Sequence, residues 1–394
     1  MSRPTVLTGL DVLVRDDWKP LRGQRVGLVT NPAAVDARLR HIADLLADAP
    51  SVKLAALFGP EHGLGAESQD LVGVADAHHP RYRCPIHSLY GDSVESLHPR
   101  PETLRGLDVL VIDLPDIGTR YYTFQATMLY CLEAASSVGL TVFVLDRPNP
   151  LNGVTVEGPI LRPGYESFVG PHPIPTRHGM TIGELARLYI SERKINVRLH
   201  VVPCEGWRRD SYFDETGLPW VLPSPNMPTL DTAIVYPGQC LLEGTNLSEG
   251  RGTTRPFELC GAPWIDPHRL ARRLEEQAVP GVAFRPVTFR PTFQKFAGQT
   301  CGGIQLYVRD RAAFRPVRTG LAVLAAFRAE DPDHFRWRTE AYEFVADPRA
   351  IDLLFGSSRE RIGLEAGLSA DEISRPWADD ETAFRERRQP YLLY

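Results

Sequence analysis

The sequence lacks two features that would point to a membrane or to a nucleic acid. No apolar run approaches the roughly 18 residues that a membrane-spanning helix needs. Basic residues are not in excess, because 44 Lys and Arg stand against 49 Asp and Glu and leave a net charge of −5. Such a balance gives no electrostatic footprint for nucleic acid or for an anionic membrane surface. We therefore predict neither a membrane nor a nucleic acid as a partner, and the oligomeric state stays open.

Cysteine is also scarce. The six cysteines include no CxxC pair, which favours buried reduced thiols over disulfides or a metal site. They are Cys84, Cys131, Cys204, Cys240, Cys260 and Cys301. The first residues, from Met1 to Asp11, hold a short apolar patch followed by charge and lack the pattern of a secretory signal. On both grounds we expect a cytoplasmic protein.

Cofactor motifs are missing as well. The chain has no Walker A or HExxH sequence, and Gly63-Leu64-Gly65 lacks the third glycine of a dinucleotide fingerprint. His62 and His78-His79 could join Asp113 or Asp116 as metal ligands, but their spacing matches no recognisable site. We therefore predict no cofactor and no metal. A metal-dependent hydrolase that uses His62 and nearby carboxylates is kept as an alternative.

Five short apolar runs alternate with helical stretches, a pattern typical of a parallel sheet that is buried on both faces. The runs are Arg25–Val29, Leu57–Phe58, Ile86–Leu89, Val109–Ile112 and Val142–Leu145. Each is followed closely by polar side chains, among them Asn31, Glu61 and Asp113. In such sheets ligands bind outside the carboxyl ends of the strands. The chain is thus predicted to gather one polar cluster on a rigid sheet, which indicates an enzyme.

The alternation of strands and helices stops near a proline-rich stretch, Trp220–Thr229, which suits a stiff connector rather than a helix or a central strand. Before it we predict helices at Ala37–Ala47, Pro101–Arg105, Phe124–Ser137 and Thr181–Arg193, and a last strand at Val197–Val202. Beyond it we predict strands at Gly281–Phe289 and Gly303–Val308 and a helix at Phe314–Arg328. The prediction is an α/β domain with a mainly parallel sheet over residues 1–228, followed by a smaller α+β domain over residues 229–394.

Glu61 is the candidate general acid. It lies between Gly59-Pro60 and His62-Gly63, so it is expected on a turn at the end of an apolar run. A glutamate in a partly apolar cleft is suited to donate a proton near neutral pH. The alternative is a solvated loop carboxylate or the partner of a helix N-cap.

Two acids and a cation follow the run that ends at Ile112. Asp113 is expected to accept hydrogen bonds from loop amides, whereas Asp116 is the candidate for a second catalytic carboxylate. Arg120, with Tyr121 and Tyr122, is suited to bind a ligand anion and to stack on a sugar ring. The alternative is that Arg120 merely pairs with Asp116.

Further candidate binding residues lie on three other segments. Arg147 and Asn149 occupy a fixed turn whose acid, guanidinium and amides match a polyhydroxylated ligand, unless that turn only braces a loop. A glycine-rich loop carries Asn246, Glu249 and Arg251, and it serves either ligand approach or an interdomain brace. Asn31 and His62 complete the predicted binding set.

Five motifs occur in one order along the chain and carry a family resemblance. They are Pro60-Glu61-His62-Gly63, Asp146–Pro150, Arg177–Leu185, Pro223–Thr229 and Glu243–Thr254. Together they resemble the bacterial exo-β-N-acetylmuramidase family, long known only as a domain of unknown function. The similarity runs from about Gly9 to Tyr394, so it covers essentially the whole chain.

The resemblance implies a Rossmann-like first domain that holds the active centre and an auxiliary second domain. It implies hydrolysis of terminal N-acetylmuramic acid from the non-reducing end of peptidoglycan fragments, with Glu61 as the catalytic glutamate. The 2-acetamido group of that sugar can act as nucleophile, with Asp116 orienting it. The lactyl carboxylate calls for an arginine, for which Arg120, Arg147 and Arg251 are the candidates.

The expected partners are small muropeptides or disaccharide fragments that reach the cytoplasm for recycling. Characterised members of the family are exported, which this chain's amino terminus does not predict. The alternative from a different class is a non-catalytic muropeptide-binding or sensing protein that keeps the fold.

Overall fold

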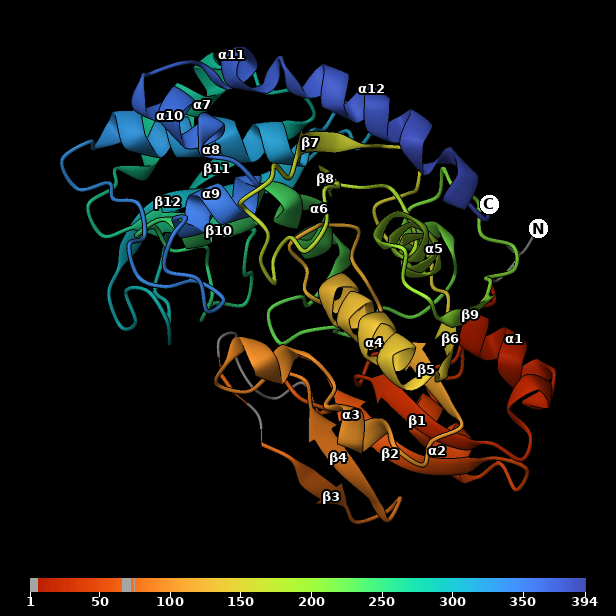
Figure 1. Ribbon diagram of the computed structural model, residues 1–394. Helices are drawn as coiled ribbons and strands as arrows, with labels where there is room; N and C mark the ends of the chain where they lie inside the picture. The colour runs from red at the N-terminus through yellow and green to blue at the C-terminus, as the bar shows by residue number, and fades with distance from the viewer. Residues whose placement is uncertain (1–5, 66–71, 74) are drawn as a thin grey trace.

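The centre of the fold is a seven-stranded sheet in the amino-terminal half of the chain (Figure 1). The computed structural model describes residues 6–65, 72–73 and 75–394, and within them the strand order is β3-β4-β2-β1-β5-β6-β9. The strands are β1 (Arg25–Thr30), β2 (Lys53–Gly59), β3 (Ala77–His79), β4 (Cys84–Ser88), β5 (Val109–Asp113), β6 (Thr141–Leu145) and β9 (Arg198–Val202). Neighbours pair in parallel except for β3 and β4. From β1 the chain first adds strands on the β2 side of the sheet and then, from β5 onward, on the other side. Doubly wound sheets bind ligands at such a reversal of strand order, which lies here between β1 and β5.

Helices cover both faces of this sheet. Successive residues of each strand point to opposite faces, so the apolar residues of a strand such as β5 need a cover on each side. The helices are α1 (Gly9–Arg15), α2 (Ile42–Ala47), α3 (Pro101–Leu104), α4 (Phe124–Val138) and α5 (Ile182–Arg193). On β5, Leu110 and Ile112 share a core with α4 and α5. Val109 and Val111 share the opposite core with α1 and α2. The predicted α/β domain is therefore confirmed.

The predicted helix at Ala37–Ala47 begins later than expected, at Ile42. The Asp36 side chain accepts hydrogen bonds from the backbone amides of Arg38 and Arg40, at 2.9 and 2.8 Å. A short acidic side chain that bonds to its own loop stabilises a turn instead of a helix. The start of α5 matches its prediction, because Thr181 and Glu184 form a capping box.

The second domain is smaller and combines a three-stranded antiparallel sheet with helices. Its strands, in the order β10-β12-β11, are β10 (Leu259–Ala262), β11 (Val282–Phe289) and β12 (Cys301–Val308). Its helices are α6 (Leu230–Gln239), α7 (Pro267–Glu276), α8 (Pro316–Glu330), α9 (Ala350–Phe355), α10 (Arg359–Glu365), α11 (Ala370–Ser374) and α12 (Trp377–Arg388). This confirms the predicted α+β character of the second part of the chain. Over the described ranges, no helix is long and apolar enough to cross a membrane.

Two helices of the second domain meet at a pair of glycines. A Cβ on Gly238 of α6 would lie 2.0 Å from the carbonyl oxygen of Pro316, and one on Gly320 of α8 would lie 2.3 Å from the carbonyl oxygen of Gly238. Glycine is the residue that allows the two backbones to approach so closely. This contact fixes α6, which leads from the proline-rich connector into the second domain.

A two-stranded ribbon joins the domains. It consists of β7 (Glu157–Ile160) and β8 (Pro175–Arg177), and α12 of the second domain packs along β7 (Figure 1). On β7 the Glu157 carboxylate accepts a hydrogen bond of 2.9 Å from the backbone amide of Arg318. Arg318 lies in the first turn of α8, whose N-cap residue makes no side-chain capping hydrogen bond. A side chain of the ribbon thus satisfies an amide of a helix in the second domain.

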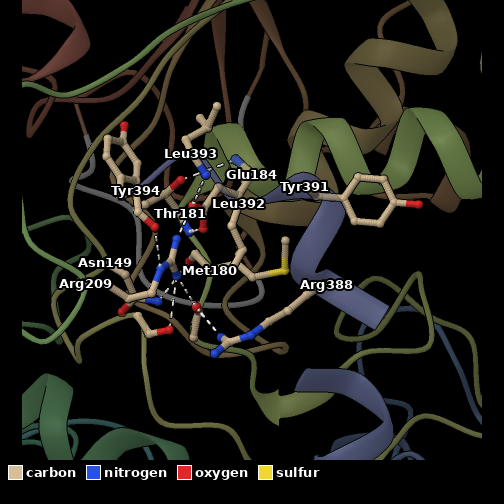
Figure 2. Close-up of polar contacts among 12 residues, drawn as sticks. Asn149, Met180, Thr181, Glu184, Arg209, Arg388, Tyr391, Leu392, Leu393 and Tyr394 are labelled. Atoms are coloured by element: carbon tan, nitrogen blue, oxygen red, sulfur yellow. Dashed lines mark hydrogen bonds and ion pairs between the residues drawn. The ribbon is translucent and has the colours of Figure 1, made fainter. Parts of the chain in front are cut away.

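The carboxyl-terminal residues return to the first domain and are held there by buried polar groups (Figure 2). The Tyr394 hydroxyl donates to Asp146 at 2.7 Å, and the backbone amide of Leu393 donates to Glu184 at 2.8 Å. Arg209 pairs with Glu184. Arg388 donates to the carbonyl of His178 at 3.1 Å. The motifs around Asp146 and Glu184 therefore anchor the end of the chain.

Replacing Glu157 by Gln is expected to stabilise the protein at neutral pH. Burial raises the pKa of Glu157 from 4.5 to about 7, against the opposing effect of the Arg318 amide. Between these values the folded state holds a proton that the unfolded state has released. The stabilisation from this group is therefore complete below pH 4.5 and is lost as the pH rises through 7.

Glutamine keeps the acceptor for the Arg318 amide and removes the ionisation. The free energy of unfolding of the variant should rise relative to wild type between pH 5 and pH 8, by up to about 3 kcal/mol. Urea unfolding at four pH values measures this difference. A difference that stays constant over this range would contradict the account.

Candidate functional site

Glu61 lines a cavity that both domains build, here named the Glu61 cavity. About 520 Å³ of space lies between its walls. The lining residues are Glu61, His62, Tyr121, Tyr122, Thr123, Phe124, Val169, Ser224, Asn226, Met227, Tyr236, Glu243, Arg251, Phe257, Tyr342 and Glu343. They come from the turn after β2, the start of α4, the proline-rich connector and the second domain. Sites between domains and beyond strand ends are typical of ligand binding.

The local sequence fixes the position of Glu61. Strand β2 ends at Gly59, where a Cβ would lie 2.9 Å from the amide nitrogen of Leu64, so the chain can turn tightly only with glycine there. His62 and Gly63 both have left-handed backbone angles, with φ of 73° and 80°. The turn leaves Glu61 only 6% exposed. The Thr123 hydroxyl, just before α4, donates to Oε2 of Glu61 at 2.7 Å.

A buried ion-pair cluster forms another wall of the cavity. Arg251 donates to Oε1 of Glu243 at 2.7 Å and lies 3.4 Å from a carboxylate oxygen of Glu249. The Tyr342 hydroxyl donates to Oε2 of Glu243 at 2.6 Å. Lys295 pairs with Glu249 at 2.9 Å. Burial alone would raise the pKa of Glu243, but Arg251 and Tyr342 hold that pKa below its usual range.

Aromatic rings form the apolar side of the cavity. Tyr236 makes edge-to-face contacts with Tyr121 and Tyr122, with ring centroids 5.7 and 6.0 Å apart. Phe257 packs edge-on against Tyr236 at 4.8 Å, and the Arg251 guanidinium lies 5.1 Å from the centre of the Phe257 ring. Burial raises the pKa of the Tyr122 hydroxyl well above its usual range, so that hydroxyl stays neutral. Such a wall suits the apolar face of a sugar ring.

Asp116 and Arg147 line a different pocket at the strand-order reversal, here named the switch-point pocket. It encloses about 550 Å³ between the end of β5 and the connector. Asp116 accepts a hydrogen bond of 2.7 Å from the amide of Gly118 and lies 3.4 Å from Nε2 of His178. Arg147 forms a bidentate pair with Asp113 at 2.5 and 2.8 Å. The structure therefore does not bring Asp116 into the cavity of Glu61 as the sequence prediction assumed.

Arg120 is also placed away from both pockets. Its side chain is fully buried and donates to the carbonyls of Pro159 and Ile174 at 2.9 Å and of Leu354 at 2.6 Å. Burial lowers the pKa of Arg120 to about 10. The predicted pairing with Asp116 is absent among the contacts of the described residues. Arg120 instead satisfies backbone carbonyls that would otherwise be buried without a donor.

The three predicted amides brace loops. Asn31 donates to the carbonyl of Pro223, Asn149 to that of Met180 and Asn246 to that of His334, each at 2.8 Å. None of the three is among the residues that line either pocket. The sequence showed polar side chains after strands, but it could not separate amides that serve the backbone from amides that serve a ligand. Glu249 also lines neither pocket, and its carboxylate pairs with Arg251 and Lys295.

Five predicted residues share the Glu61 cavity: Glu61 itself, His62, Tyr121, Tyr122 and Arg251. Tyr121 presents its ring, because its hydroxyl donates to the carbonyl of Pro237. Within the described ranges, no three side chains of His, Cys, Asp or Glu are grouped so that they could hold a metal ion. The residues proposed for the metal alternative are dispersed, since His78 and His79 lie on β3 and Asp113 is paired with Arg147.

Several cavity residues were missed. Glu243 opens the motif that contains Arg251, and Thr123 directly follows Tyr122, so nearness in sequence was a usable signal for these. Tyr342 and Glu343 lie outside all five motifs, in a turn without glycine or asparagine. No local pattern indicates that this turn reaches the first domain.

Comparisons with known proteins agree along the whole chain. The profile "Exo-beta-N-acetylmuramidase NamZ, N-terminal" matches residues 26–231, and "Exo-beta-N-acetylmuramidase NamZ, C-terminal" matches residues 234–394. The chain is 46% identical over 393 residues to the peptidoglycan beta-N-acetylmuramidase NamZ of Bacillus subtilis (strain 168), covering 100% of this chain and 92% of that protein.

Two crystal structures of DUF1343 family proteins from Bacteroides fragilis NCTC 9343 are similar to the whole fold. One is 35% identical with a TM-score of 0.89 and covers 100% of both chains. The other is 29% identical with a TM-score of 0.78 and covers 99% of both chains.

Replacing Arg251 by Met is expected to destabilise the fold by roughly 3–5 kcal/mol, because it leaves the buried carboxylate of Glu243 without its paired cation. The matched control is Arg255→Met. Arg255 pairs with Glu258 at 3.2 Å, but its side chain is 46% exposed. An exposed partner of this kind contributes about 1 kcal/mol or less. Thermal and urea unfolding of both variants measure the difference in the free energy of unfolding. Equal losses in the two variants would contradict a larger contribution from the buried ion pairs of Arg251.

Proposed function

The chain belongs to the exo-β-N-acetylmuramidase NamZ family and is a glycoside hydrolase, and we propose that Glu61 is its general acid. We propose further that it removes terminal N-acetylmuramic acid from the non-reducing end of peptidoglycan fragments. The observation that carries the assignment of Glu61 is its burial in a cavity that tyrosines and a cation also line. That environment matches a proton donor which works beside a sugar ring.

Cleavage of the glycosidic bond requires a proton on the leaving oxygen as the carbon–oxygen bond breaks. Thr123 fixes Oε2 of Glu61, which leaves Oε1 to carry that proton. The ionised Glu61 then accepts a proton from the attacking water. Among the substrates of such enzymes, 2-acetamido sugars can supply their own nucleophile through the acetamido oxygen.

Recognition of the lactyl group falls to Arg251. Of the three arginines considered from the sequence, Arg251 lines the Glu61 cavity, whereas Arg147 lines the switch-point pocket and Arg120 lines neither. A guanidinium has more than one donor and binds carboxylates in a fixed geometry. Arg251 can therefore keep its bond to Glu243 while another donor meets the lactyl carboxylate. The tyrosine wall would receive the apolar face of the same sugar.

We also propose that the enzyme works in a reducing compartment on small fragments. All six cysteines lie within the described residues, and each is a buried free thiol. Thiols persist in this form where disulfides do not accumulate. Cell fractionation with an activity assay tests the proposal. Activity confined to the culture medium would contradict it.

Replacing Glu61 by Gln is expected to remove nearly all hydrolysis of a disaccharide whose leaving group is a sugar. Glutamine keeps the shape and the contact with Thr123 but cannot deliver a proton, which is worth about 10²–10⁴-fold in kcat. The control Glu102→Gln changes an exposed carboxylate on α3 and should leave kcat unchanged.

Parallel assays of the wild type with a chelator separate the other readings. Loss of activity with rescue by a divalent ion would support a metal-dependent hydrolase. A wild type that binds the sugar without turnover would indicate a sensing protein. A Glu61→Gln variant that keeps most of its activity would rule out Glu61 as the acid.

The enzyme should prefer a β-muramide to the matching β-glucosaminide, because Arg251 and the cavity are arranged for the lactyl carboxylate. A polar site that loses its partner group discriminates by about 10⁴-fold at best. The comparison should include a muramide whose lactyl group is converted to the amide, which keeps its size and removes its charge. Equal kcat/KM for all three substrates would overturn the assignment of Arg251.

A further inference from the structure

We propose that Glu343 is the second catalytic carboxylate and that the second domain supplies it to the reaction centre of Glu61. The inference rests on the proposed glycoside hydrolysis. In it, Glu343 faces the sugar within the same cavity as Glu61 and stabilises the positive charge that develops around the anomeric carbon. The role that the sequence suggested for Asp116 passes to this residue.

The position of Glu343 is the first ground. Its side chain lines the Glu61 cavity and is only 6% exposed, although it belongs to the second domain. The Tyr90 hydroxyl donates to Oε2 of Glu343 at 2.9 Å. Tyr90 follows β4 and is itself buried in the first domain. This hydrogen bond ties the carboxylate of the second domain to the first domain.

The backbone that carries Glu343 is the second ground. Tyr342 and Val345 exchange two hydrogen bonds of 2.9 Å, so residues 343 and 344 form a two-residue hairpin turn. Both turn residues are left-handed, with φ of 46° at Glu343 and 67° at Phe344. Turns of this type normally carry Asn-Gly, because larger side chains are strained there.

A turn that merely reversed the chain would not need a glutamate followed by a phenylalanine. Here the two side chains have separate contacts. Glu343 enters the cavity, and the Phe344 ring lies 5.8 Å from the ring of Tyr90. Backbone strain of this kind is concentrated at functional sites, where the surrounding structure fixes it. The strained turn therefore has a reason if it delivers Glu343 to the substrate.

The chemistry supplies the third ground. Glycoside hydrolysis proceeds through a transition state with positive charge on the sugar. A carboxylate near the anomeric carbon stabilises this charge. It does so whether the nucleophile is the acetamido oxygen of the substrate or a water molecule. Glu243 has both carboxylate oxygens engaged, one by Arg251 and the other by Tyr342. Asp116 lines the switch-point pocket. Glu343 lines the cavity of Glu61 and is carried there by the strained turn, so it takes the role that complements Glu61.

The test compares two substrates and three variants. One substrate is a muramic acid disaccharide with a sugar as leaving group, and the other is an aryl β-muramide with a good leaving group. For Glu343→Gln we expect kcat to fall about 100-fold or more on both substrates with KM changed little, because the lost charge acts at the sugar ring. For Glu61→Gln the loss should be larger on the disaccharide than on the aryl substrate, because only the disaccharide needs a proton on its leaving oxygen. The control Glu340→Gln, an exposed residue on the same segment, should match wild type on both.

A Glu343→Gln variant within about threefold of wild type on both substrates would overturn the inference, as would a loss confined to the disaccharide. If that variant does not fold, Tyr90→Phe removes the hydrogen bond to Glu343 and should lower kcat on both substrates with KM nearly unchanged. An unchanged kcat in Tyr90→Phe would then overturn the inference. A wild type that hydrolyses neither muramide would instead refute the proposed function.

Discussion

A charged side chain can be buried only where a group of opposite charge or a hydrogen-bond donor meets it, and this constraint shapes the site around Glu61. Three carboxylates, of Glu61, Glu243 and Glu343, line one cavity. Thr123, Arg251 and Tyr90 each donate to one of them. Because these partners come from both domains, the cavity exists only when the domains are docked. The second domain therefore forms part of the wall of this cavity.

The docking of the two domains depends on polar contacts away from the cavity. Glu157 on the ribbon accepts from an amide of α8, and the carboxyl-terminal residues return to Asp146 and Glu184 of the first domain. These contacts, with the glycine pair between α6 and α8, set the orientation of the second domain. That orientation decides where the hairpin of Tyr342 and Glu343 lies. The motifs around Asp146 and Glu184 thus influence the cavity indirectly, because they bind the carboxyl-terminal residues of the second domain.

The sheet was predictable because its strands are buried on both faces, so their positions are apolar in succession. The position of Glu61 beyond the end of a strand was predictable because a glycine-flanked turn follows that strand. The function of the other polar residues was harder to predict. Asn31, Asn149 and Arg120 also follow strands, but the carbonyls that they bond lie far away in sequence. Pairings of this kind are set by tertiary structure, and no local pattern reports them.

Glu343 shows the opposite difficulty. It lies in a turn whose residues do not match the usual turn signal, and its partner Tyr90 is 253 positions away. Local propensity argues against a tight turn at Glu343-Phe344, and the fold imposes one. A mismatch between sequence preference and structure was therefore the informative feature, and it became visible only when the backbone angles were known.

The most direct test of the account is a crystal structure of the Glu61→Gln variant with a bound muramic acid disaccharide. The account predicts that the muramic ring occupies the Glu61 cavity against the tyrosine wall. The glycosidic oxygen should lie about 2.6–3.2 Å from the side chain at position 61, within hydrogen-bond reach. The lactyl carboxylate should meet Arg251, and Glu343 should face the anomeric side of the ring. A disaccharide bound in the switch-point pocket, with its glycosidic oxygen beside Asp116, would contradict the account.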